Sequence, residues 1–140
     1  MWYNPMLAWL LRSPLHGMLS GSFMLISVRG RKSGRIICTP VNYVREGNRI
    51  WVTSQRNRTW WRNLRGGAPV NVFVQGRELK GHGDAMVDQP SVAAGLATYL
   101  RLKPQLAKYY HVGLDATGQP VPADCERAAL ERVAICIDLQ

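Results

Sequence analysis

Short apolar segments, separated by turns that contain glycine, run from Phe23 to about Val87 and restrict the possible folds more than any other feature. Segments rich in valine, isoleucine and threonine are typical of β-strands, and turns this short are typical of hairpins. A further apolar run near the end of the chain, Val-Ala-Ile-Cys-Ile, indicates a buried last strand. The predicted strands cover residues 23–28, 36–44, 49–53, 70–74, 77–87 and 132–139.

Helices are predicted between the hairpins and the last strand. Pro90 stands near the first turn of a helix over residues 88–102, and Pro104 ends it. Shorter helices are predicted over residues 105–111 and 124–131. Hairpins followed by helices and one closing strand indicate a mainly β chain with helices, of the α+β class. About six antiparallel strands fit a small barrel better than an open sheet, because closure removes exposed edges.

The N-terminal 20 residues are apolar but interrupted by Pro5, Arg12, Pro14 and His16. The segment is too broken for a membrane-spanning helix, which needs about 20 apolar residues, and it lacks the basic start of a signal peptide. We expect an apolar helix over residues 1–20 that either packs on the barrel or contacts a membrane surface or the active site. The whole chain, residues 1–140, has the length of one domain.

Positive charge is concentrated in one segment. Residues 29–65 contain ten Lys and Arg but one acid, Glu46, so this segment carries the whole net charge of +9. Such a concentration indicates an anionic partner, whether phosphate, polycarboxylate, nucleic acid or a lipid headgroup. Arginine outnumbers lysine fourteen to four; this suits bidentate contacts with phosphate or carboxylate, but genomic codon bias would also produce it.

The usual catalytic and metal-binding motifs are missing from the sequence. The pattern G-x-S-x-G, the pattern H-E-x-x-H and the phosphate-binding G-x-x-x-x-G-K-[ST] are all absent. Cys38, Cys125 and Cys136 have no C-x-x-C spacing, which argues against disulfides and a zinc site and favours a reducing cytosol. The histidines are isolated, so no metal site is predicted. If the protein is an enzyme, a redox cofactor is the natural source of the reactive atoms.

The basic turn Gly30-Arg31-Lys32-Ser33-Gly34 is one candidate binding element. Its glycines allow backbone N–H groups to converge on an anion, and Arg31, Lys32 and Ser33 add charge and a hydroxyl. The alternative is a solvated hairpin turn without a ligand. Pro40, which follows within the second strand, removes a ladder donor and indicates a sheet edge, a bulge or an opening.

A pair of tryptophans is the second candidate. In a short helix from Trp60 to Arg65, Trp60 and Asn63 lie three positions apart and share a face, whereas Trp61 points elsewhere. A planar ring beside an amide suits the wall of a site for a flat heterocycle. The alternative places both tryptophans in the core.

These motifs, taken in order, resemble the deazaflavin-dependent nitroreductase family. The resemblance rests on the turn at 30–34, Thr39-Pro40, Trp60-Trp61-Arg62-Asn63-Leu64 and Pro69-Val70-Asn71-Val72, and it covers roughly Phe23 to Asp84. It implies an FMN-binding-like split β-barrel, on which the N-terminal helix and the helices of the C-terminal half pack. It also implies coenzyme F-420, a deazaflavin, as the cofactor, with FMN as the alternative.

The resemblance also implies roles for individual residues. The turn residues Arg31, Lys32, Ser33 and Gly34 would bind the phosphate and glutamate tail. Thr39, Pro40 and Thr53 would lie along the deazaflavin ring. Arg56 would be a basic phosphate contact, and Trp60 and Asn63 would complete the tail groove. Tyr109 and Tyr110, with Tyr110 preferred, are candidates for a proton donor or substrate-orienting residue near the expected pocket; the alternative is that both are only packing residues.

The sequence departs from the family pattern at two strand positions. Ile37 stands where the family usually has arginine, and Asn42 stands where many members have an aromatic residue. Arg35 would replace the missing arginine only if the strand has already begun at that position, because side chains two residues apart then share a face.

The function expected from residues and resemblance is a deazaflavin-dependent oxidoreductase acting on quinone-like, unsaturated or nitro compounds. The alternative is a non-catalytic barrel that binds a fatty acid, haem or flavin. Nucleic-acid binding by the basic segment is disfavoured, because no nucleic-acid motif accompanies it. We expect a cytoplasmic monomer or homodimer, with peripheral membrane contact through the N-terminal segment as a further possibility.

Overall fold

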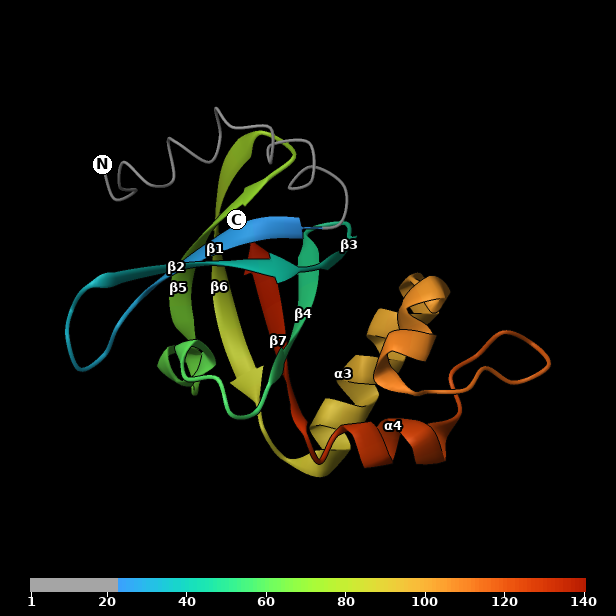
Figure 1. Cartoon of the computed structure of the whole chain (residues 1–140). Coiled ribbons are helices and arrows are strands. Elements are labelled where there is room, and N and C mark those ends of the chain that lie inside the picture. The colour runs from blue at the N-terminus through green and yellow to red at the C-terminus, as the bar shows by residue number, and fades with distance from the viewer. Residues whose placement is uncertain (1–22) are drawn as a thin grey trace.

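Seven antiparallel strands form one sheet that curls into a half-barrel in the computed structural model, which describes residues 23–140 (Figure 1). The order of strands in the sheet is β2-β1-β5-β6-β7-β4-β3. The fold is therefore the split-barrel α+β fold that the sequence predicts. The strands are β1 (Phe23–Arg29), β2 (Ile36–Asn42), β3 (Val44–Glu46), β4 (Arg49–Gln55), β5 (Ala68–Val74), β6 (Arg77–Met86) and β7 (Arg132–Leu139).

One predicted strand is two strands in the structure. The segment 36–44 ends as β2 at Asn42, and after Tyr43 the chain resumes as β3, which pairs with β4 rather than continuing along β1. Tyr43 is buried at this change of direction. The predicted six strands become seven because the tertiary structure bends the chain here.

The interior of the half-barrel is an apolar core, built by the alternation of side chains along each strand. Val70, Val72 and Val74 of β5 point inward, as do Ile135 and Ile137 of β7, and all five are buried. Trp60, Trp61 and Leu64 close this core from one end, from the 3₁₀ helix η1 (Trp60–Leu64). The predicted short helix is thus present in a tighter form, one residue shorter than expected.

A helical layer covers the outer face of β4 and β7 (Figure 1). It contains α3 (Gln89–Leu102), the 3₁₀ helix η2 (Pro104–Tyr110) and α4 (Pro122–Ala128). Asp88 caps α3 by accepting a hydrogen bond from the backbone N–H of Ser91 (3.1 Å). This layer has its own apolar core with β7, centred on Leu96, Tyr99 and Leu100.

The predicted N-terminal helix over residues 1–20 lies outside the described residues. Among residues 23–140, no helix is long and apolar enough to cross a membrane.

Candidate functional site

A groove of about 290 Å³ lies where the half-barrel is split, between β2 and β4. It brings together five residues that the sequence analysis selected from separate segments. Thr39 and Pro40 come from β2, Thr53 from β4, Trp60 from η1 and Tyr110 from η2. Pro40 lies on β2, the strand at one end of the sheet, so the predicted sheet edge is confirmed.

The groove is rich in hydrogen-bonding groups and positive charge. Arg58 and Arg132 line it, together with Asn42, Ser54 and Gln55, and no carboxylate lines it among the described residues. Asn42, one of the departures from the family pattern, therefore faces the groove with an amide. The other departure, Ile37, packs against the barrel core, whereas Arg35 is exposed one residue before β2 begins.

Tyr110 of η2 and Thr53 of β4 are joined at the groove, and Tyr110 in turn packs on the buried Tyr99. The hydroxyls of Thr53 and Tyr110 lie 2.6 Å apart and are hydrogen bonded, and either can donate. The Tyr110 ring packs edge-on against Tyr99, with 6.0 Å between ring centroids. Tyr99 is fully buried, and within residues 23–140 its hydroxyl has no partner at hydrogen-bonding geometry. Burial, with a smaller effect from Tyr110, raises the pKa of the Tyr99 phenol, so Tyr99 stays protonated.

The guanidinium of Arg132 lies over the rings of the neighbouring tyrosines. Its central carbon is 4.8 Å from the ring centroid of Tyr110 and 5.9 Å from that of Tyr109. Cation–π attraction of this kind holds the positive charge at the edge of the groove. Sequence reasoning missed Arg132 and Arg58, because only the tertiary structure brings the start of β7 and the β4–η1 loop beside η2.

The basic turn lies apart from the groove lining and is joined to η1. The backbone N–H of Arg31 donates to the side-chain oxygen of Asn63 (2.9 Å), whose amide in turn donates to the carbonyl of Trp60 (3.0 Å). The Arg31 guanidinium donates to the carbonyls of Arg65 (2.5 Å) and Gly67 (3.5 Å). Arg31 and Asn63 therefore dock the turn onto η1, next to a groove wall formed by Trp60.

The other residues of the turn have different roles in its geometry. Gly34 adopts a positive φ of 71°, and its N–H donates to the carbonyl of Gly30 (2.8 Å). Ser33 accepts a hydrogen bond from the N–H of Arg35 (3.2 Å). Lys32 is exposed, and its side chain makes no hydrogen bond or ion pair among the described residues. Lys32 is thus the turn's available cation.

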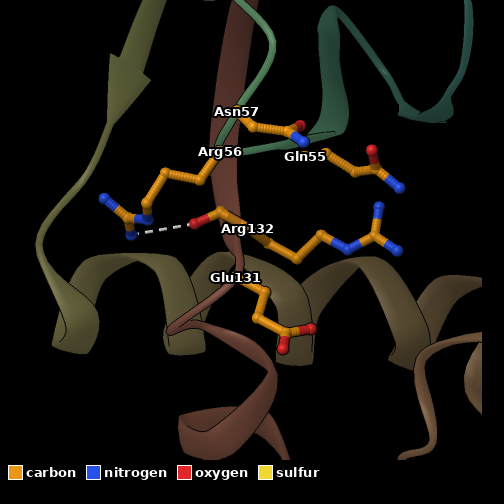
Figure 2. Close-up of a pocket in the computed structure, with 5 residues that line it drawn as sticks. All are labelled: Gln55, Arg56, Asn57, Glu131 and Arg132. Atoms are coloured by element: carbon orange, nitrogen blue, oxygen red, sulfur yellow. Dashed lines mark hydrogen bonds between the residues drawn. The ribbon is translucent and has the colours of Figure 1, made fainter.

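Arg56 has a structural environment that the sequence did not indicate. One nitrogen of its guanidinium donates to the carbonyls of Val87 (2.8 Å), Ala129 (3.1 Å) and Arg132 (2.9 Å). Figure 2 shows the guanidinium groups of Arg56 and Arg132 on opposite sides of β7. This side chain joins the starts of α3 and β7 to the end of α4. The expected phosphate contact at Arg56 stays a prediction.

The two tryptophans are both buried, Trp60 with 6% and Trp61 with 5% of its surface exposed. Trp60 nevertheless contributes to the groove wall as well as to the core. Trp61 packs in the core, and the guanidinium of Arg62 lies 5.6 Å from its ring centroid. Both rings thus lie in the core, as the alternative interpretation of the motif placed them, and Trp60 also lines the groove. Its role in cofactor binding stays a prediction.

The residues present fit a flat anionic cofactor such as a deazaflavin. The groove offers a tryptophan wall, threonine and amide groups and two arginines. Around the adjoining turn and η1, the side chains of Lys32, Arg35 and Arg65 have no described hydrogen bond or ion pair. A planar ring with a phosphorylated, carboxylated tail matches this distribution. No cluster of side chains suited to a metal ion occurs within residues 23–140.

Comparison with solved structures shows the same fold in proteins of low sequence identity. An F420-H2 dependent reductase matches with a TM-score of 0.51 at 16% identity, over 87% of this chain and 96% of that one. A protein of the pyridoxinephosphate oxidase family from Clostridium acetobutylicum matches with a TM-score of 0.55 at 13% identity, over 94% and 84%. A protein described as a domain-swapped dimer matches with a TM-score of 0.57 at 14% identity, over 95% and 93%.

The fold is that of the split-barrel proteins, and the groove lies at the split of the barrel. The family model of the F420H(2)-dependent quinone reductases matches residues 13–124, and the chain belongs to that family of F-420-dependent oxidoreductases. No curated protein sequence matches the chain.

Proposed function

We propose that this protein is a reductase that uses reduced coenzyme F-420 to reduce a lipophilic quinone-like, unsaturated or nitro compound. The observation that carries the proposal is the groove itself. It gathers Thr39, Pro40, Thr53, Trp60 and Tyr110 at the split of the barrel and has no carboxylate lining among the described residues. Family membership supports F-420 as the cofactor.

In this proposal the side chains position the reactants and control protons. Reduced F-420, when bound, supplies a hydride from its deazaflavin ring. Thr39, Pro40, Thr53 and Trp60 hold the flat ring, while Lys32 and its neighbours hold the anionic tail. Tyr110, whose hydroxyl is bonded to Thr53, is the proposed proton donor or substrate-orienting group.

Several expectations from the sequence remain proposals beside this one. FMN is the alternative cofactor, because the related barrels are FMN-binding-like, and a non-catalytic binding protein is the alternative function. A cytoplasmic location, a monomer or homodimer, the absence of nucleic-acid binding and peripheral membrane contact through residues 1–20 are likewise predictions.

The direct test is a titration of the purified protein with oxidised F-420 and, separately, with FMN. We expect tight binding of F-420 with weaker or no binding of FMN, followed by oxidation of reduced F-420 when 1,4-naphthoquinone is added. The control is Arg101→Gln, on the outer surface of α3, which should behave as the wild type. Tighter binding of FMN than of F-420 would make FMN the assigned cofactor. Binding of F-420 without oxidation of its reduced form would favour the non-catalytic function.

A further inference from the structure

A second hollow of about 430 Å³ adjoins the groove at Tyr109 and Tyr110. Tyr109, Tyr110 and Arg132 line both spaces, so the two hollows share these three residues as a common wall. The outer hollow is completed by Arg127, Leu130 and Glu131, from the end of α4 and the turn before β7. We call this outer hollow the trough.

The trough has an apolar rim. Tyr109 is 63% exposed and Leu130 is 61% exposed, and both are among the few large hydrophobic side chains that reach solvent in the described part of the chain. Exposed apolar side chains that gather at the mouth of a cavity are typical of a binding surface. An apolar substituent on a ligand in the groove would extend out of the groove along this rim.

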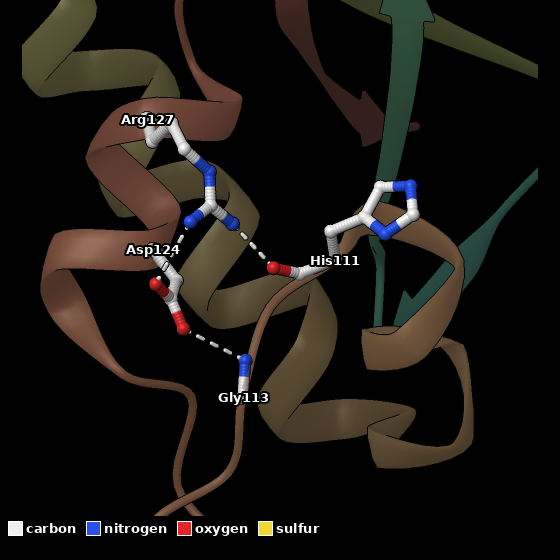
Figure 3. A network of polar contacts seen from close by, with 4 residues as sticks. All are labelled: His111, Gly113, Asp124 and Arg127. Atoms are coloured by element: carbon white, nitrogen blue, oxygen red, sulfur yellow. Dashed lines mark hydrogen bonds and ion pairs between the residues drawn. The ribbon is translucent and has the colours of Figure 1, made fainter.

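Two nearby arginines already have protein partners: Arg127, which also lines the trough, and Arg56, which lines a further hollow together with Arg132. Arg127 pairs with Asp124 (3.1 Å) and donates to the carbonyl of His111, while Asp124 accepts from the N–H of Gly113 (2.9 Å) (Figure 3). This network fixes the end of η2 against α4. Arg56, as described above, is bonded to three carbonyls.

Arg132 differs from both of these arginines. It is half-buried, and its guanidinium makes no hydrogen bond or ion pair among residues 23–140; only the tyrosine rings hold it. The carboxylate of its neighbour Glu131 points away from this guanidinium (Figure 2). A half-buried cation with unused donors, at the shared wall of two adjoining cavities, is suited to bind an oxygen of a ligand that lies in the groove and extends over this wall.

We infer that Arg132 binds the acceptor oxygen of the substrate, a quinone carbonyl or nitro oxygen, while the substrate's apolar substituent lies on Tyr109 and Leu130. This rests on the proposed function and assigns, within it, the residue that orients the acceptor oxygen of the substrate. Arg132 thereby orients the substrate ring and stabilises the negative charge that develops on the substrate oxygen during reduction.

The test compares ligands with and without the oxygen. Binding of 1,4-naphthoquinone and of naphthalene is measured by tryptophan fluorescence, both on cofactor-free protein and on protein saturated with oxidised F-420. Arg132→Gln should weaken naphthoquinone binding about tenfold or more, because a hydrogen bond from a charged donor is lost. Naphthalene binding should change less than about twofold, and the surface control Arg101→Gln should match the wild type for both ligands.

The substituent is tested in the same assay. A naphthoquinone with an eight-carbon alkyl chain should bind the wild type more tightly than the unsubstituted ring, and Leu130→Ser should remove most of that difference. Thermal unfolding checks that each variant is folded. If Arg132→Gln does not fold, Arg132→Met takes its place.

The outcomes separate this inference from the proposed function. An equal loss of naphthoquinone and naphthalene binding, or no loss of either, would overturn the role of Arg132. A comparable loss of F-420 affinity in Arg132→Gln would place this residue in the cofactor site instead. If the wild type fails to bind F-420 or to oxidise its reduced form, the proposed function fails, and binding to cofactor-free protein still tests Arg132.

Discussion

Arginines of similar appearance in the sequence have different roles according to what surrounds the guanidinium. Arg56 and Arg58 are two positions apart in the basic segment. Arg56 is bonded to three carbonyls of the helical layer and β7, whereas Arg58 is exposed and lines the groove. The charge density of a segment indicates an anionic partner but does not assign individual side chains to it.

Arg56→Ala should therefore act mainly on stability. Three part-buried carbonyls lose their donor, and we expect the free energy of unfolding to fall by about 2–4 kcal/mol. Arg58→Ala is the matched control and should stay within about 0.5 kcal/mol of the wild type. Chemical denaturation of both variants measures the free energy of unfolding, and F-420 titration measures cofactor binding. A stable Arg56→Ala protein with weakened F-420 binding would instead support the phosphate contact that the sequence predicts.

At the scale of elements, the basic turn and η1 form one unit, although about 30 residues separate them. The side chain of Asn63 accepts a hydrogen bond from the backbone N–H of Arg31 and donates one to the carbonyl of Trp60. The turn, the short helix and the groove wall are therefore linked through hydrogen bonds. Lys32 points out of this unit and makes no described contact. The two adjacent cations of the turn should therefore respond differently to mutation.

Lys32→Ala should weaken F-420 binding about tenfold and leave stability unchanged, because it removes a charge that has no described protein partner. The salt dependence of F-420 binding should also become smaller in this variant. Arg31→Ala should lower the free energy of unfolding by about 1 kcal/mol, because the guanidinium bonds to the carbonyls of Arg65 and Gly67, just after η1, are lost. Fluorescence titration at two salt concentrations and denaturation of both variants distinguish the roles; unchanged F-420 affinity in Lys32→Ala would remove this turn from the cofactor site.

At the scale of the whole molecule, the groove depends on how closely the helical layer docks on the half-barrel. Tyr110 reaches Thr53 only because η2 follows α3, and α3 packs on β7 and β4. Gly95 of α3 lies close against β7, where an added Cβ would stand 2.9 Å from the Cβ of Ala134. Packed interiors do not absorb such an overlap without backbone movement.

Gly95→Ala should be destabilising, although alanine is intrinsically better in a helix by about 1 kcal/mol. Overpacking costs about 1–3 kcal/mol, so we expect a net loss of about 1–2 kcal/mol in the free energy of unfolding. Adding Ala134→Gly removes the opposing methyl group, and the double variant should recover at least about 1 kcal/mol relative to the sum of the single changes. Additive single effects would show that the two elements do not meet at this point.

Local patterns were sufficient to predict most elements of the described chain. β1, β5, β6 and β7 lie within about two residues of the predicted strands, and α3 within one. These elements follow from alternation, glycine turns and a proline near the helix start, which act over a few residues. The bend at Tyr43 that creates β3 was missed, because it is set by pairing with β4 rather than by local preference.

By itself, the sequence determined the α+β class, most of the turns and the family. It left Pro40 at an edge, a bulge or an opening, and the structure places it on the edge strand β2. Only the tertiary structure decided which side chains meet at the split of the barrel and which arginines are already bonded. Arg132 and Tyr110 lie 22 residues apart in the sequence, yet their side chains are in contact because β7 and η2 converge on β4. Contacts of this kind depend on how elements dock, and local sequence patterns contain no information about docking.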